Sequence, residues 1–240
     1  MKMKNYFLYI AIVFVSLFVS CKKEEAEKPK VTYETTSKAK PEVVSDANQI
    51  EVADLPINME GTNFLIHPIG VMSGNGKGIK SSYDSEQGFT ISNYGEYQIT
   101  GYLKNLKFQE IGKDTIYALT DKQILIETAT YLKTFADKSK QQLLVYSLAD
   151  MDTNKDGKLD NNDIKSLYIS TVSGQKFTKL SADFQELIDW KIIESKNLLY
   201  FRTIEDSNKN GEFDAKDRLQ YQFVNLLDKE WKVISYKPFN

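Results

Sequence analysis

Two twelve-residue stretches of this chain carry oxygen-bearing side chains at the same spacing, and they constrain the fold more than any other feature. The first covers residues 152–163 and the second covers residues 206–217, which lie 54 positions later. Each has Asp or Asn at positions 1, 3, 5, 9 and 12, and Gly at position 6, where the loop must turn sharply. A hard cation that takes about six to eight oxygen ligands needs this arrangement, so both stretches are predicted to be calcium loops.

Position 7 of such a loop offers its backbone carbonyl, so a lysine there is compatible with binding. The predicted ligands are Asp152, Asn154, Asp156, Lys158, Asp160 and Asp163 in the first loop, and Asp206, Asn208, Asn210, Glu212, Asp214 and Asp217 in the second. The first loop brings four side-chain carboxylates among its five Asx ligands, whereas the second brings three because Asn210 replaces Asp156. We therefore expect the first site to bind more tightly. Clusters of Asp, Asn and Gly are also ordinary turn composition, but the matched register of two such clusters favours a metal site.

Position 12 holds Asp163 and Asp217, where the calcium-sensor EF-hand loop has a bidentate Glu. The shorter carboxylate reaches an ion less easily, so a lower affinity is expected. In this respect the loops resemble those of dockerin modules and extracellular calcium-binding repeats.

The sequences that flank the loops predict strands on both sides. Residues 143–146 enter the first loop and residues 167–172 leave it, while residues 198–204 and 219–224 flank the second. These runs are short, rich in β-branched and aromatic residues, and partly alternating, which is typical of strands. Each ion is therefore expected to tie two strands together as a structural support, and a calcium-sensor switch is not expected.

The start of the chain has the pattern of a secretory signal peptide over residues 1–20. Lys2 and Lys4 precede an apolar stretch from Tyr6 to Val19, which is too short for a comfortable membrane span. The single cysteine of the chain, Cys21, follows Ser20 and resembles the lipidated cysteine of the bacterial lipobox. This resemblance implies that Cys21 carries the lipid that anchors the mature protein to a membrane. A plain secreted protein with an incidental cysteine is the alternative.

Residues 21–55 are predicted to be a lipidated cysteine followed by a disordered tether, because they contain many charges and few aromatic residues. The run that starts at Lys22 and contains Glu24 and Glu25 resembles the surface-export signal of Bacteroidetes lipoproteins, and an ordinary solvated charge run is the alternative. Lys22 also differs from the aspartate that retains lipoproteins in the inner membrane of enterobacteria. These resemblances imply an outer-membrane lipoprotein that faces the periplasm or the cell surface.

Residues 56–240 have the length of one ordinary domain. The formal net charge of the chain is −2 and no large Lys/Arg cluster occurs, so nucleic acid is not expected as a partner.

Many short strand-like runs separated by turn residues predict an all-β fold. Besides the loop flanks, the predicted strands are residues 64–69, 89–92, 97–100, 106–109, 115–119, 124–128, 177–180, 188–193 and 231–236. Residues 129–142 fit a helix as easily as a strand followed by a loop.

The residues that follow the first loop extend the repeat, over approximately residues 141–195 and 196–240. A strand, a hairpin with Gly174, the Leu180–Ser181 pair and then a strand containing Trp190 resemble the blade repeat of Tol-type periplasmic β-propellers. The chain lacks the Ser-Pro-Asp-Gly segment that follows the tryptophan in that family. The resemblance implies a small or incomplete propeller-like array of three to four blades. A twisted β-sandwich is the alternative.

No catalytic constellation is apparent in the sequence. His67 is the single histidine, and it lies in an apolar run where packing is the more usual role. The glycine-rich segment 74–78 lacks the pattern of a phosphate-binding loop. Two hypotheses remain: a calcium-stabilised envelope lipoprotein that is a non-enzymatic binding or assembly module for a protein or glycan, and a hydrolase of glycans or envelope polymers with structural calcium sites.

Overall fold

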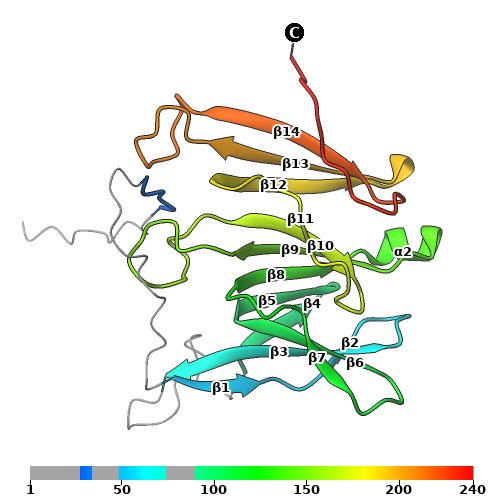
Figure 1. Ribbon diagram of the computed structural model, residues 1–240. Helices are drawn as coiled ribbons and strands as arrows, with labels where there is room; N and C mark the ends of the chain where they lie inside the picture. The colour runs from blue at the N-terminus through cyan, green and yellow to red at the C-terminus, as the bar shows by residue number, and fades with distance from the viewer. Residues whose placement is uncertain (1–27, 34–48, 74–89, 240) are drawn as a thin grey trace, which may run out of the picture.

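The computed structural model describes residues 28–33, 49–73 and 90–239. Within these ranges the chain is mainly β-strand, and its antiparallel strands form three sheets that follow one another from the bottom to the top of Figure 1. The prediction of an all-β chain is therefore confirmed.

Strands that are distant in the sequence meet in each sheet. The first sheet has the order β1-β3-β6-β7, with β2 beside β3, and contains β1 (Gln49–Ala53), β2 (Ile57–Asn58), β3 (Phe64–Ser73), β6 (Asn105–Glu110) and β7 (Ile116–Ala118). The second has the order β11-β10-β9-β8-β5-β4 and contains β4 (Ser92–Gly95), β5 (Gln98–Leu103), β8 (Leu125–Tyr131), β9 (Leu143–Ala149), β10 (Ser166–Thr171) and β11 (Thr178–Lys179). The third is the meander β12 (Gln185–Ile193), β13 (Leu198–Glu205), β14 (Arg218–Asn225) and β15 (Ile234–Ser235), with the short 3₁₀ turn η1 (Glu194–Lys196) between β12 and β13.

The predicted strands have counterparts in β3 to β15, although several boundaries differ. In β5 the side chains are alternately half-buried and buried, which is the period-two pattern of a strand with one face on the core. β1 and β2 are not among the predicted strands. β1 lies where a disordered tether was expected and pairs with β3 from Gln49 opposite Ser73 to Ala53 opposite Ile69. The β-domain therefore begins before residue 56.

The ambiguous region 129–142 contains both a strand and a helix. β8 continues to Tyr131, and α2 (Lys133–Ser139) follows. The helix buries Phe135 and Ala136 and is followed by its C-cap residue Lys140, which has the left-handed backbone conformation common at helix C-termini. Seven residues are too few for a helix that is stable alone, so the packing of its buried residues stabilises it.

The internal repeat appears as two four-stranded antiparallel meanders. The first consists of β8, β9, β10 and β11, and the second of β12, β13, β14 and β15. In both, a predicted calcium loop joins the second strand to the third. The repeat unit thus starts at β8, one strand before the predicted start at residue 141.

The apolar side chains form two clusters, and β9 contributes to both. Leu144, Tyr146 and Leu148 face the cluster shared by the first and second sheets. Leu143 and Val145 face the cluster shared by the second sheet, α2 and the third sheet. Because every residue of β9 is buried, its sequence is a nearly continuous apolar run.

The two meanders meet through equivalent faces. Val145 of β9 and Leu199 of β13 are related by the 54-residue repeat, and both belong to the same apolar cluster. In a propeller, equivalent residues of successive blades would lie in successive interfaces, not in a shared one. The described sheets therefore do not confirm a propeller.

Candidate metal sites

Both predicted calcium loops lie at the same end of the sheets, on the left in Figure 1. The first joins β9 to β10 and the second joins β13 to β14. Antiparallel neighbours hold the ends of each loop in place, because β9 pairs with β10 up to Leu148 opposite Ser166, and β13 pairs with β14 up to Glu205 opposite Arg218.

The first loop is organised by hydrogen bonds from its own backbone to its polar side chains. The Asp152 carboxylate accepts from the backbone N–H groups of Lys155 at 2.7 Å and Gly157 at 2.9 Å. Three further side chains each accept from the N–H group two positions later, which gives the pairs Asn154 with Asp156, Asp156 with Lys158, and Asp160 with Asn162. These short-range bonds are typical of Asx turns and explain why Asp and Asn are needed at the odd-numbered positions.

The last predicted ligand, Asp163, closes the first loop. One carboxylate oxygen accepts from the N–H group of Thr153 at 2.6 Å, and the other accepts from the N–H group of Asp160 at 2.9 Å. Asp163 is fully buried, and this burial raises the pKa of its carboxyl group. A divalent cation beside it would offset the cost of burying the charged form.

The second loop repeats the arrangement of the first. Both loops share six hydrogen bonds from a backbone N–H group to a side chain. The N–H group of position 6 donates to position 1, that of position 5 to position 3, that of position 7 to position 5, and that of position 11 to position 9. The side chain of position 12 accepts the other two, from the N–H groups of positions 2 and 9. Gly211 donates to Asp206 at 2.7 Å, and Ser207 donates to Asp217 at 3.0 Å. The loops therefore agree in conformation as well as in composition.

The backbone conformation agrees at the two unusual positions. Position 4 is a lysine with positive φ in both loops, 61° at Lys155 and 57° at Lys209. Position 6 has φ of 84° at both Gly157 and Gly211, a conformation that glycine adopts without steric cost. A non-glycine residue in the left-handed region costs about 1–2 kcal/mol, so the surrounding contacts must stabilise the turn at each lysine.

The donor set suits a hard cation, but the acidic side chains do not converge on a common point. Within residues 28–33, 49–73 and 90–239, no group of three or more His, Cys, Asp and Glu side chains is placed so that it could hold a metal ion. The carboxylates instead turn toward N–H groups of their own loops. A carboxylate has about four lone-pair sites, so these bonds leave acceptor capacity for an ion.

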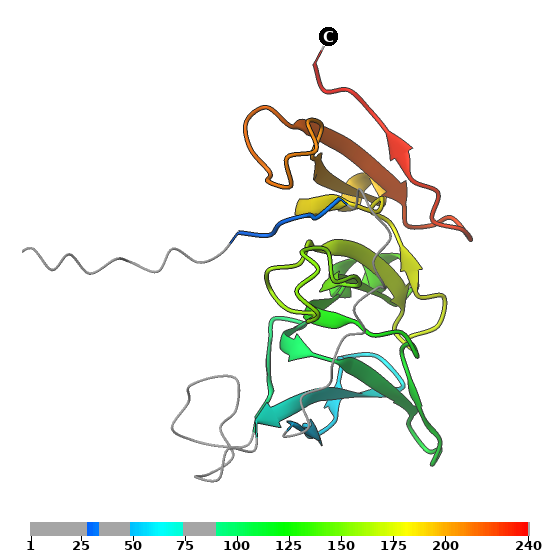
Figure 2. The same ribbon diagram turned by 60° about the vertical axis from the view of Figure 1, so that its left-hand side comes forward.

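Residues 28–33, which were predicted to belong to the tether, lie between the two loops and are drawn in blue in Figures 1 and 2. Val31 is buried, and its N–H group donates to the carbonyl of Gly211 at 2.9 Å. Thr32 donates through its N–H group to the carbonyl of Thr153 at 2.8 Å. The apolar and β-branched run Val31-Thr32-Tyr33 inside a charged stretch is the signal that could have predicted this contact.

Tyr33 extends the contact toward the second loop. Its ring lies 6.3 Å from the ring of Phe184, measured between centroids. Burial, together with the charge of Asp206 and a hydrogen bond to its side chain, raises the pKa of the Tyr33 hydroxyl to about 12. The segment is therefore in contact with a predicted ligand at position 1.

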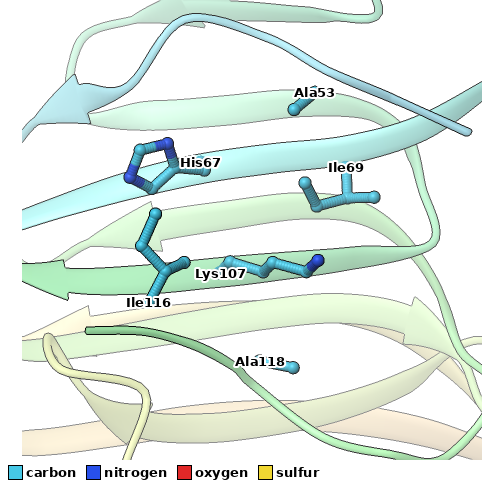
Figure 3. Close-up of a pocket in the computed structure, with 6 residues that line it drawn as sticks. All are labelled: Ala53, His67, Ile69, Lys107, Ile116 and Ala118. Atoms are coloured by element: carbon cyan, nitrogen blue, oxygen red, sulfur yellow. The ribbon is translucent and has the colours of Figure 1, made fainter. Parts of the chain in front are cut away.

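The described residues line surface depressions, of which two could serve as binding sites. The first, of about 530 Å³, lies on the first sheet and is lined by Ala53, His67, Ile69, Lys107, Ile116 and Ala118 (Figure 3). His67 is half-buried there, and its Nε2 lies 3.3 Å from Oε1 of Gln109. The second, of about 510 Å³, lies beside β4 and β5 and has Glu96 as its one acidic lining residue. Neither depression brings two carboxylates together.

Other predicted features lie outside the described residues. Cys21 and the apolar stretch from Tyr6 to Val19 are among them, as is the glycine-rich segment 74–78. No helix in the described part of the chain is both long and apolar enough to cross a membrane.

Comparison of the chain with protein-family models, curated proteins and solved structures gave no match. The resemblances to Bacteroidetes lipoproteins, Tol-type propellers and dockerin loops therefore remain predictions from the sequence.

Proposed function

We propose that this protein is a calcium-stabilised lipoprotein of the cell envelope, and that its β-domain is a non-enzymatic module for binding or assembly. The calcium part of the proposal depends on the six backbone-to-side-chain hydrogen bonds that loops 152–163 and 206–217 share. Turn-forming composition alone would allow many different turns. Two loops with these shared contacts and with closely similar φ angles at positions 4 and 6 favour a common ligand requirement.

Each loop would hold one ion with the side chains of positions 1, 3, 5, 9 and 12 and the carbonyl of position 7, which is Lys158 or Glu212. Calcium supplies positive charge among these oxygen donors. It would thereby tie β9 to β10 and β13 to β14, which are joined by these loops. The ions would be structural supports for the two meanders.

Of the two architectures predicted from the sequence, we favour the twisted β-sandwich over the propeller-like array. Val145 of the second sheet and Leu199 of the third sheet are buried in the same apolar cluster. This supports the sandwich, in which two sheets pack face to face. A protein or glycan partner would bind to an outer face of this scaffold. The hydrolase alternative has no support from the two depressions described above.

The cellular part of the proposal depends on Cys21. A lipid on this cysteine would attach the protein to the outer membrane, on its periplasmic or cell-surface side. The partner would then be an envelope protein or glycan, and nucleic acid is not proposed.

Thermal unfolding with and without calcium tests the proposal. We would use residues 22–240, because residues 28–33 contact the loops. For a dissociation constant of about 10 µM and 1 mM free calcium, each site should stabilise the fold by about 2.7 kcal/mol. EDTA should reverse the shift, and magnesium, which requires a smaller octahedral site, should give a smaller one. An unfolding midpoint that does not respond to calcium contradicts the structural-calcium proposal.

A further inference from the structure

Residues 28–33 lie between the two loops and donate hydrogen bonds to both. The N–H groups of Lys30 and Thr32 donate to carbonyls of the first loop, at Asn162 and Thr153, at 3.2 and 2.8 Å. The N–H group of Val31, between them, donates to Gly211 of the second loop. Successive donors thus reach opposite loops, as in an extended chain that spans a gap between two partners.

Side chains strengthen this contact. Val31 is only 4% exposed, and the removal of its apolar side chain from water favours the docked position. The Thr32 hydroxyl donates to the carbonyl of Asn154 at 3.0 Å. A peptide segment held by four hydrogen bonds and a buried side chain is docked and does not merely pass the surface.

The docking contacts and the predicted calcium ligands use different backbone atoms. The segment binds carbonyls at loop positions 2, 3, 6 and 11, whereas calcium would use the carbonyl of position 7. An ion can therefore bind the position-7 carbonyls beside the docked segment, and it would share the Asp206 carboxylate with the Tyr33 hydroxyl. An ion that fixes the loop conformation would also fix the carbonyls that the segment needs.

The glycines at position 6 differ in one respect. A Cβ atom added at Gly211 would lie 2.5 Å from the carbonyl oxygen of Val31, a distance that requires a shift of the backbone. A Cβ added at Gly157 would meet nothing within 4 Å. Both glycines have φ of 84°, so close approach of the segment distinguishes Gly211 from its counterpart.

We propose that the two loops together form a docking site for residues 28–33 of this chain, and that calcium in the loops strengthens the docking. The calcium dependence rests on the function proposed above. Docking shortens the connection between Cys21 and the domain. From Cys21 to Val31 there are ten residues, which reach at most about 35 Å, whereas the 28 residues from Cys21 to Gln49 reach about 100 Å. The docked state therefore keeps the loop end of the domain close to the anchoring membrane.

Amide hydrogen exchange in the full-length protein, purified in detergent, tests this site. With 1 mM calcium the amides of residues 30–32 should exchange roughly tenfold or more slowly than after EDTA treatment. Gly211→Ala should remove the protection of these amides in calcium. Gly157→Ala is the matched comparison, since it introduces the same backbone strain without the contact to Val31, and it should reduce the protection less than Gly211→Ala does.

A second variant keeps the test decisive if Gly211→Ala fails to fold. Val31→Ser removes the buried side chain outside the loops, and Lys30→Ser at the neighbouring exposed position is its control. Val31→Ser should lose most of the protection and should retain the calcium-dependent shift in melting temperature.

If calcium raises the melting temperature but residues 30–32 exchange equally fast in all variants, the docking site is refuted and the calcium proposal stands. If calcium has no effect on melting or on exchange, the calcium proposal and the calcium dependence of docking are refuted together.

Discussion

The side-chain carboxylate of Glu186, on β12, accepts a hydrogen bond from the backbone N–H group of Lys165 at 2.5 Å. Lys165 is the second residue after the first loop, so this bond links the exit of the loop to the third sheet. Two charged groups act on Glu186: the ammonium group of Lys165 and the carboxylate of Glu127, which form an ion pair with each other at 2.7 Å. Burial is the main cause that raises the pKa of Glu186 to about 7, and Glu127 raises it further while Lys165 lowers it.

The raised pKa predicts that Glu186 reduces stability at neutral and alkaline pH. Between about pH 4.5 and pH 7 the folded protein holds a proton on Glu186 that the unfolded chain has released. The free energy of unfolding should therefore fall as the pH rises through this range. Glu186→Gln should remove this dependence and stabilise the protein at pH 8 by roughly 1–3 kcal/mol relative to the wild type, since one pKa unit corresponds to about 1.4 kcal/mol and partial solvation reduces the effect.

Urea unfolding of both proteins at pH 4 and pH 8 provides the measurement. The two should be nearly equally stable at pH 4, where Glu186 is protonated in both the folded and the unfolded state. Glu230→Gln, at an exposed position, controls for the loss of one negative charge. A stability difference between Glu186→Gln and wild type that is the same at both pH values contradicts the prediction.

The two loops are predicted to bind calcium with different affinity. Because the first loop has four side-chain carboxylates and the second has three, Asp152→Ala should reduce the calcium-dependent stabilisation more than Asp206→Ala. Each substitution also removes the acceptor for a position-6 glycine N–H group, so this shared loss is matched between the variants. Isothermal titration of calcium into the wild type and both variants measures the difference. Loss of the tighter binding event in Asp206→Ala would reverse our assignment.

Gly174 is predicted to be essential for the packing of Phe108. A Cβ atom at this position would lie 2.4 Å from the ring of Phe108, which is fully buried and cannot move aside. Gly174 also has φ of 74°. Gly174→Ala should therefore destabilise the protein by about 2–4 kcal/mol through overpacking and backbone strain.

The control for this substitution is Gly112→Ala. Gly112 has φ of 87°, but a Cβ atom there would meet nothing within 4 Å. Its substitution should cost about 1 kcal/mol, the strain alone. Equal losses of stability in the two variants, measured by denaturant unfolding, would show that the contact with Phe108 has no energetic role.

Lipidation of Cys21 is predicted to determine membrane attachment. In a Cys21→Ala variant the thiol that would carry the lipid is absent, so the expressed protein should move from the detergent phase to the aqueous phase on Triton X-114 partitioning. Ser20→Ala keeps a small residue before the cysteine and should remain in the detergent phase. If the Cys21→Ala variant partitions like the parent protein, the lipid anchor is not on this residue.

Local patterns account for the parts of the fold that could be predicted. In β5, alternating burial follows directly from alternating residue types. In the loops, most shared hydrogen bonds join residues two to five positions apart, so the order of Asp, Asn and Gly is enough to specify them. The helix α2 was ambiguous because its seven residues contain too few turns to show a helical period.

The sequence by itself determined that this protein is an all-β chain with two matching loops, because strand alternation and Asx turns depend on near neighbours. The tertiary structure decided which strands share a sheet, that equivalent faces of the two meanders share one apolar cluster, and that residues 28–33 dock between the loops. The physical reason is distance along the chain. Val31 and Gly211 are 180 residues apart, and their hydrogen bond forms only after the sheets have brought both loops to the same end of the molecule.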